Sequence, residues 1–142
     1  PQGEMRIETG QVARELTGSW NVEIPESDGG AAPFEALHTF GGDGTFVETS
    51  SLLGTRTEGP AHGVWTRTLG GFVLTFELFA FDPETGDAVG RVRVRNFIHY
   101  TDRGGNAFSA LSTVDFIEPD GNVIPDIDGG PYSATRIALA GL

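Results

Sequence analysis

Apolar and polar residues alternate along most of this chain, and that period is typical of β-strands. The clearest example is segment 89–100, where Arg91, Arg93 and Arg95 are separated by apolar residues. Successive side chains of a strand point to opposite faces, so we expect the arginines to face water and the residues between them to face the interior. No segment shows a helical period over a helical length. The pattern predicts an all-β protein.

Turn residues divide the alternating segments at short intervals. Glycine-rich turns at 41–44 and at Gly70-Gly71 are examples. The predicted strands are 18–24, 34–40, 45–52, 62–69, 72–81, 89–100, 107–117 and a less regular last strand that pairs best from 132 to 138. Consecutive strands with short links predict an eight-stranded antiparallel up-and-down β-barrel. We expect one domain over 1–142, a flexible 1–10 and a short helical turn over 11–17.

The alternation assigns one face of most strands to the barrel interior. The expected inward residues are Trp20, Val22, Ile24, Phe34, Ala36, His38, Phe40, Phe72, Leu74, Phe76, Leu78, Val92, Val94, Asn96, Ile98, Tyr100, Phe108, Ala110, Ser112, Val114 and Phe116. For 34–40, the face with Phe34, Ala36, His38 and Phe40 is favoured as the inward one, but the pattern does not settle it. For 45–52, the pattern does not decide which face points inward, and Glu48 could face the interior. In 62–69, Val64 opposes Trp65 and the pattern does not choose between them.

Composition narrows the classes of function. The net charge is −11, so a general nucleic-acid interface is not expected. There is no cysteine, which excludes thiol chemistry. No apolar stretch is long enough to span a bilayer, so no membrane insertion is expected. No secretory signal is visible at the start of the sequence, which favours a cytoplasmic location.

A short motif suggests a family. Gly18-Ser19-Trp20 opens the first predicted strand, and Arg136 lies near the end of the last one. This combination resembles the calycins, which are the lipocalins and their avidin-like and fatty-acid-binding relatives. The resemblance implies that Arg136 stacks on the Trp20 indole and bonds the main chain of the entry segment, closing one end of the barrel. It also implies an apolar small-molecule ligand.

The expected interior is apolar with a few polar residues, which matches a pocket for a mostly apolar ligand oriented by one or two hydrogen bonds. The candidate ligand-binding residues are Phe34, His38, Phe40, Phe72, Leu74, Phe76, Leu78, Val94, Asn96, Ile98, Tyr100, Phe108, Ser112 and Val114. His62 is a further possible polar residue of the interior. The alternative is a lumen filled by side chains, as in a structural or interaction module.

Small barrels also host enzymes. Allene oxide cyclase and the spirotetronate cyclases use comparable barrels, in which an apolar cavity holds a substrate near its reactive conformation. A cofactor-independent cyclase or isomerase is therefore the alternative function. Its candidate catalytic residues are His38 as acid or base, Tyr100 and Asn96 as hydrogen-bond donors, and Glu48 as a carboxylate.

No cofactor or metal is expected. His38, His62 and His99 are too scattered for a metal site, although His38 or His62 could serve as an axial haem ligand. The acidic stretch 126–130 lacks calcium-loop spacing and is better explained as a turn. If Trp65, Phe79, Phe81 and Phe97 all point outward, they would form an apolar patch, and a homodimer through it is plausible.

Overall fold

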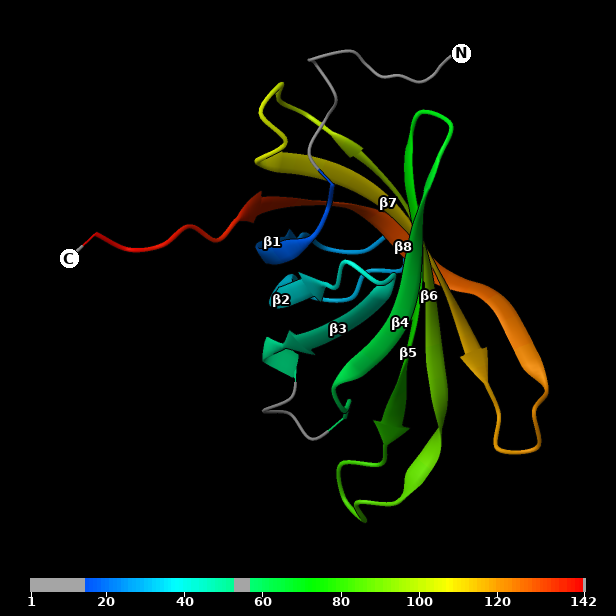
Figure 1. Ribbon diagram of the computed structural model, residues 1–142. Helices are drawn as coiled ribbons and strands as arrows, with labels where there is room; N and C mark the ends of the chain where they lie inside the picture. The colour runs from blue at the N-terminus through cyan, green and yellow to red at the C-terminus, as the bar shows by residue number, and fades with distance from the viewer. Residues whose placement is uncertain (1–14, 53–56, 142) are drawn as a thin grey trace.

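The computed structural model describes residues 15–52 and 57–141, and these residues form an all-β fold (Figure 1). The eight strands are β1 (Gly18–Ile24), β2 (Phe34–Phe40), β3 (Thr45–Ser50), β4 (Ala61–Thr68), β5 (Gly71–Phe81), β6 (Ala88–Tyr100), β7 (Ala107–Ile117) and β8 (Val123–Arg136). The predicted eight-stranded antiparallel barrel is confirmed. Among the described residues, no helix has the length and apolarity to cross a membrane.

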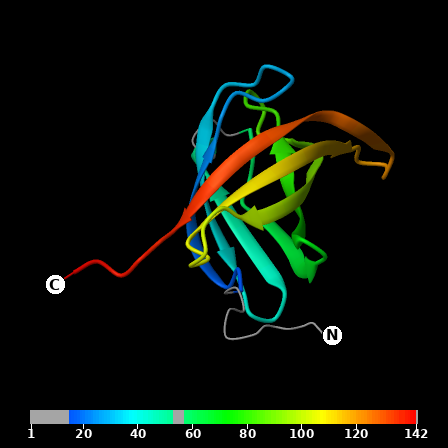
Figure 2. The ribbon, with the colours of Figure 1, turned by 90° about the horizontal axis from the view of Figure 1, so that it is seen from above.

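Each strand pairs antiparallel with the next, and β8 returns to pair with β1. The closing register sets Trp20 opposite Arg136 and Val22 opposite Ala134. Closure leaves no unpaired sheet edge within the barrel, which removes the usual route to edge-to-edge aggregation. The view from above shows the strands encircling one interior (Figure 2).

The sequence patterns located the strand boundaries within a residue or two, except at the start of β8. The structure differs from the expectation at three places. β8 begins at Val123, well before the expected pairing from 132, and ends at Arg136. The hairpin between β4 and β5 turns at Leu69 and Gly70, one residue earlier than expected, because Gly71 pairs with Thr68. The helical turn expected over 11–17 is not seen: residues 15–17 are not helical, and the rest lies outside the described residues.

The early start of β8 belongs to a hairpin that extends beyond the barrel wall (Figures 1 and 2). Its register is irregular, since Val114 lies opposite Asp128 while Phe116 lies opposite Ile124. The additional residues of β8 include Asp126, which adopts a φ of 55°. Proline and acidic residues obscure the alternation there, so the pairing was invisible in the sequence.

On the outer face, Asp115 anchors this irregular region. Its carboxylate is fully buried and accepts hydrogen bonds from Arg93 and Arg95 at 2.9–3.0 Å and from the Asp126 N–H at 3.1 Å. The hydrogen bond from Arg95 holds the pKa of Asp115 well below its usual range, with help from the Asp126 N–H and Arg93, although burial opposes the shift. On the same face, Glu77 pairs with Arg91 at 3.4 Å.

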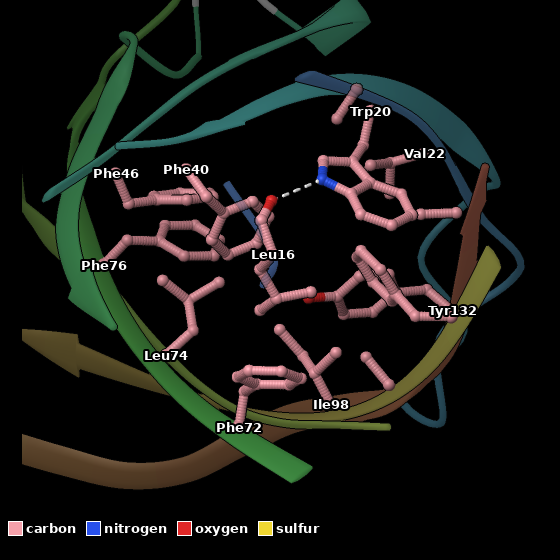
Figure 3. Packing of buried hydrophobic residues seen from close by; sticks show 14 of the residues in the cluster. Leu16, Trp20, Val22, Phe40, Phe46, Phe72, Leu74, Phe76, Ile98 and Tyr132 are labelled. Carbon is pink, nitrogen blue, oxygen red and sulfur yellow. Dashed lines mark hydrogen bonds between the residues drawn. The ribbon is translucent and has the colours of Figure 1, made fainter. Parts of the chain in front are cut away.

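One end of the barrel is filled by aromatic side chains (Figure 3). Leu16 enters this end and is fully buried, and its carbonyl accepts a hydrogen bond of 2.9 Å from the Trp20 indole N–H. The Trp20 and Phe108 rings lie 4.7 Å apart, and Phe40 packs against Phe108 at 6.3 Å. This end is therefore a packed core with no room for a ligand.

Arg136 covers the packed end in the way the calycin resemblance implies. Its guanidinium lies 4.3 Å from the Trp20 ring centroid and donates to the carbonyls of Glu15, Thr17 and Gly105 at 2.7–3.1 Å. Gly18 has a φ of 126°, and a Cβ there would lie 2.8 Å from the Arg136 guanidinium. The glycine is therefore required both by its backbone conformation and by this close approach.

The three strands whose facing the sequence did not settle are now assigned. In β2, Ala36, His38 and Phe40 are buried with the interior, as favoured, and Leu37 is exposed. In β3, Phe46 and Glu48 are buried with the interior. In β4, Trp65 packs against the core and donates to the Gly41 carbonyl at 2.9 Å, while Val64 is exposed. An outward patch containing Trp65 was therefore a wrong expectation. Phe79 and Phe97 are exposed, and Phe81 is half-buried.

We expect Arg136→Ala to lower the free energy of unfolding by about 2–4 kcal/mol, because it removes the stacking on Trp20 and leaves main-chain carbonyls unpaired. Arg103→Ala, which removes the same charge from an exposed turn, should change it by no more than about 0.5 kcal/mol. Urea unfolding of both variants measures the difference. Equal stability would show that Arg136 does not secure the barrel.

We expect the contribution of Asp115 to depend on pH. Because the folded-state pKa lies below the unfolded value of about 3.9, the stabilisation is present above that pH and is lost as the pH falls below it. Asp115→Asn should destabilise the protein by about 1–3 kcal/mol at pH 7, and the gap from wild type should narrow below about pH 4. A gap that stays constant between pH 7 and pH 3, measured by chemical unfolding, contradicts this account.

Candidate functional site

The other half of the barrel interior contains a cavity of about 190 Å³. Its described walls come from every strand except β4, from the loop between β1 and β2, and from Leu52 and Glu58 between β3 and β4. The apolar lining consists of Ile24, Ala31, Phe34, Leu52, Phe76, Leu78, Val92, Val94 and Val114. The interior is thus neither wholly filled nor wholly hollow: aromatic packing fills one end and a cavity occupies the other.

A buried histidine and a buried glutamate meet at this cavity. His38 on β2 and Glu48 on β3 are cross-strand partners, and their Nε2 and Oε2 atoms lie 2.6 Å apart. Both residues line the cavity, with exposures of 1% and 8%. Among the described residues, the other ring nitrogen of His38, Nδ1, has no hydrogen-bond partner. A histidine held by a carboxylate on one nitrogen can bind a polar group, or exchange a proton, through the other.

The His38 ring is held in place by aromatic neighbours. Phe46 contacts it edge to face with centroids 4.9 Å apart, and Phe76 lies 6.1 Å away. Phe46 and Phe76 in turn stack on each other at 5.2 Å. Aromatic contacts of this kind fix the orientation of the imidazole in an apolar setting, so its free nitrogen has a defined position.

A second polar pair lies beside the first. The Tyr132 hydroxyl on β8 donates to the Asn96 Oδ1 atom on β6 at 2.7 Å, and Tyr132 pairs with the small Ala110 on the strand between them. The Asn96 amide nitrogen donates to the carbonyls of Leu74 and Val94 at 3.1 and 3.3 Å. The ring centroids of His38 and Tyr132 are 6.0 Å apart, so the two pairs form one polar cluster.

Electrostatics links the cluster to a second carboxyl group. Glu58 lines the same cavity and is held by a bridge between its main chain and Ala80 of β5. Burial, and then the negative charge of Glu48, raises the pKa of Glu58. The same two causes raise the pKa of the Tyr132 hydroxyl far above its usual value. Two carboxyl groups, those of Glu48 and Glu58, therefore share one largely buried cavity.

The loop between β1 and β2 is fastened to β8 beside the cavity. The Asp128 carboxylate accepts hydrogen bonds from the Ser27 hydroxyl and the Gly29 N–H, each at 2.7 Å, and from the Gly129 N–H at 2.8 Å. These contacts, with that of Ser27 the largest, lower the pKa of Asp128. The Asp28 N–H also donates to the Gly129 carbonyl at 2.8 Å. Ser27, Asp128 and Gly129 all line the cavity, so this contact shapes its wall.

The structure divides the residues proposed from sequence into two groups. Those that line the cavity are Phe34, His38, Glu48, Phe76, Leu78, Val94, Asn96 and Val114. Those that are packed elsewhere in the core are Phe40, Phe72, Leu74, Ile98, Tyr100 and Phe108. Ser112 is half-buried and donates to the Gly130 carbonyl at 3.0 Å. His62 is exposed on β4, which corrects its suggested place in the interior.

Sequence reasoning missed four polar residues of the cavity lining: Tyr132, Glu58, Ser27 and Asp128. The sequence did hold a signal for Tyr132. Arg136 was expected to stack on Trp20, and Tyr132 lies four residues earlier on the same strand, so the two side chains point to the same face. Glu58 carried no such signal, since it lies between strands in a segment without alternation. Its position depends on the bridge to Ala80, which only the folded chain reveals.

The acidic stretch of β8 is used for internal contacts. Asp126 pairs with Arg95 at 2.9 Å, and Asp128 holds the loop described above. In the part of the chain that the structure describes, no group of three or more His, Cys, Asp or Glu side chains could hold a metal ion.

Comparisons with protein-family models, with curated proteins and with solved structures find no match to this chain. The barrel and its Trp20–Arg136 contact are compatible with a calycin-like fold, but the functional conclusion has to come from the cavity.

Proposed function

We propose that this protein binds a mostly apolar small molecule in the cavity of its barrel, in the manner of a calycin. The observation that carries the proposal is the unequal filling of the interior. Aromatic residues pack one end, while the other end keeps an apolar cavity with His38, Glu48, Asn96 and Tyr132 among its lining. This combination of apolar walls and a few polar groups is typical of small-molecule sites.

The unfavourable free energy of burying this polar cluster suggests that the cluster serves a function rather than stability. Burying polar groups among aromatic side chains is unfavourable unless every group is paired, and His38 Nδ1 has no partner among the residues that the structure describes. Apolar residues at these positions would fill the space and stabilise the barrel. A ligand that contacts Nδ1 would supply the missing partner.

The size of the cavity limits the ligand. Its 190 Å³ corresponds to roughly six water volumes of about 30 Å³ each. Pockets for drug-sized molecules usually measure about 300–1,000 Å³. We therefore propose a ligand of about six to ten non-hydrogen atoms, or a longer one whose tail extends beyond the cavity.

We expect 1-hexanol to bind saturably and to shift the NMR signals of cavity residues in wild-type protein. Val94→Phe places a ring in the cavity and should weaken binding by at least about tenfold. Val73→Phe makes the same change on the exposed outer face and should leave binding intact. Equal hexanol affinity in the two variants, or shifts confined to outer-face residues, contradicts the proposal.

A second candidate function is acid–base catalysis of isomerisation or cyclisation. The observation that favours it is the pairing of His38 with Glu48, since a carboxylate that orients one imidazole nitrogen leaves the other available as a general base. In this proposal Tyr132 replaces Tyr100 as the hydroxyl at the site, because Tyr100 packs against Phe72 rather than along the cavity. The candidate ranks second because, among the described lining residues, the donors of Tyr132 and Asn96 are bound within the protein rather than aimed at a developing oxyanion.

Proton exchange tests this second function without a known substrate. In D₂O, His38 would take a proton from the carbon beside the carbonyl of 2-hexanone and return a deuteron exchanged from solvent. We expect His38→Gln to abolish protein-dependent deuterium incorporation, read by mass spectrometry. Incorporation at the same rate with and without the substitution counts against a catalytic His38.

A further inference from the structure

Resting on the proposed function, we infer that the ligand carries a cationic amino group, which binds between the carboxyl groups of Glu48 and Glu58 while its apolar part contacts the cavity walls. Both residues line the cavity together with His38, whose buried Nδ1 atom has no partner among the described residues. The class of ligand is thus a small lipophilic amine rather than a fatty acid or a neutral lipid.

The first argument is an inventory of hydrogen-bond donors. Both amide hydrogens of Asn96 are directed to main-chain carbonyls, and the Tyr132 hydroxyl donates to Asn96. The Ser27 hydroxyl donates to Asp128. The donors of these side chains are therefore already used by the protein itself.

The groups that remain are acceptors. We place the His38 proton on Nε2 because its partner there is a carboxylate oxygen, which leaves Nδ1 as an acceptor in the neutral ring. The Glu48 Oε1 atom makes no hydrogen bond to the described residues, and neither does the Glu58 carboxyl group. A ligand that complements this lining must donate hydrogen bonds, and an ammonium group has three donors.

The second argument is charge. The positively charged side chains that the structure describes, six arginines, are all absent from the cavity lining. Two of them, Arg67 and Arg136, stack on Phe72 and Trp20. A ligand carboxylate would meet Glu48 and Glu58 with no cation among the described lining residues to offset them, whereas an ammonium would be attracted to both.

Three probes of equal length separate charge from apolar contact: hexylamine, 1-hexanol and hexanoate, each titrated by calorimetry at pH 7. We expect wild-type protein to bind hexylamine at least about tenfold more tightly than hexanol, because hydrogen bonds to charged groups are the stronger ones. Hexanoate should bind more weakly than hexanol.

Substitutions of the two cavity glutamates test whether they cause the preference for the amine. Glu48→Gln and Glu58→Gln should each reduce the preference for hexylamine while hexanol still binds, and retained hexanol binding reports that the cavity is intact. Glu23→Gln removes the same charge from the exposed face of β1 and should keep the full preference. Val94→Phe should abolish hexylamine binding, which excludes attraction to the acidic surface alone.

The outcomes distinguish this inference from the proposed function. If hexanol binds as tightly as hexylamine, or hexanoate binds best, the amine inference fails and the binding function stands. An amine preference that survives in both Glu48→Gln and Glu58→Gln, or binding that survives in Val94→Phe, also overturns the inference. If none of the three probes binds to wild-type protein, both proposals fail.

Discussion

The pairing of β8 with β1 is the interaction on which the rest of the structure depends. An open sheet of these strands would have two edges and no enclosed interior, whereas closure creates the lumen. The Arg136 guanidinium, Trp20 and the Leu16 carbonyl secure the closing strands at one end. Because that end is packed with aromatic rings, the other end can keep a cavity without losing the core that a chain of this size needs.

Strand pairing and barrel closure also position the polar cluster of His38, Glu48, Asn96 and Tyr132. Antiparallel pairing sets His38 opposite Glu48, and the pairing of β6, β7 and β8 places Tyr132 beside Asn96. Closure of β8 on β1 then brings the Tyr132 ring within 6.0 Å of the His38 ring on β2. The cluster lies where the packed end meets the cavity, so aromatic contacts hold the His38 ring while one of its nitrogens stays unpaired. Rigid support of a polar group beside an apolar cavity is the arrangement that small-molecule recognition requires.

Much of the fold could be predicted from the sequence because the period of two is strong in β1, β2, β5, β6 and β7. The Trp20–Arg136 contact was also predictable from a few residues near the two ends of the barrel. Facing in β4 was not, since Val64 and Trp65 are equally plausible inside. The extended β8 and the position of Glu58 depend on long-range pairing, and the size of the cavity depends on side-chain packing that alternation does not encode.

The central claim is that the polar cluster meets a ligand in the cavity, and the imidazole of His38 reports it most directly. The chain has three histidines, and the other two, His62 and His99, are exposed on the outer face. Side-chain ¹⁵N NMR during a hexylamine titration should show the Nδ1 signal of His38 moving saturably while the signals of His62 and His99 stay in place. Binding that leaves His38 Nδ1 unmoved, or that shifts all three histidines alike, would contradict the account.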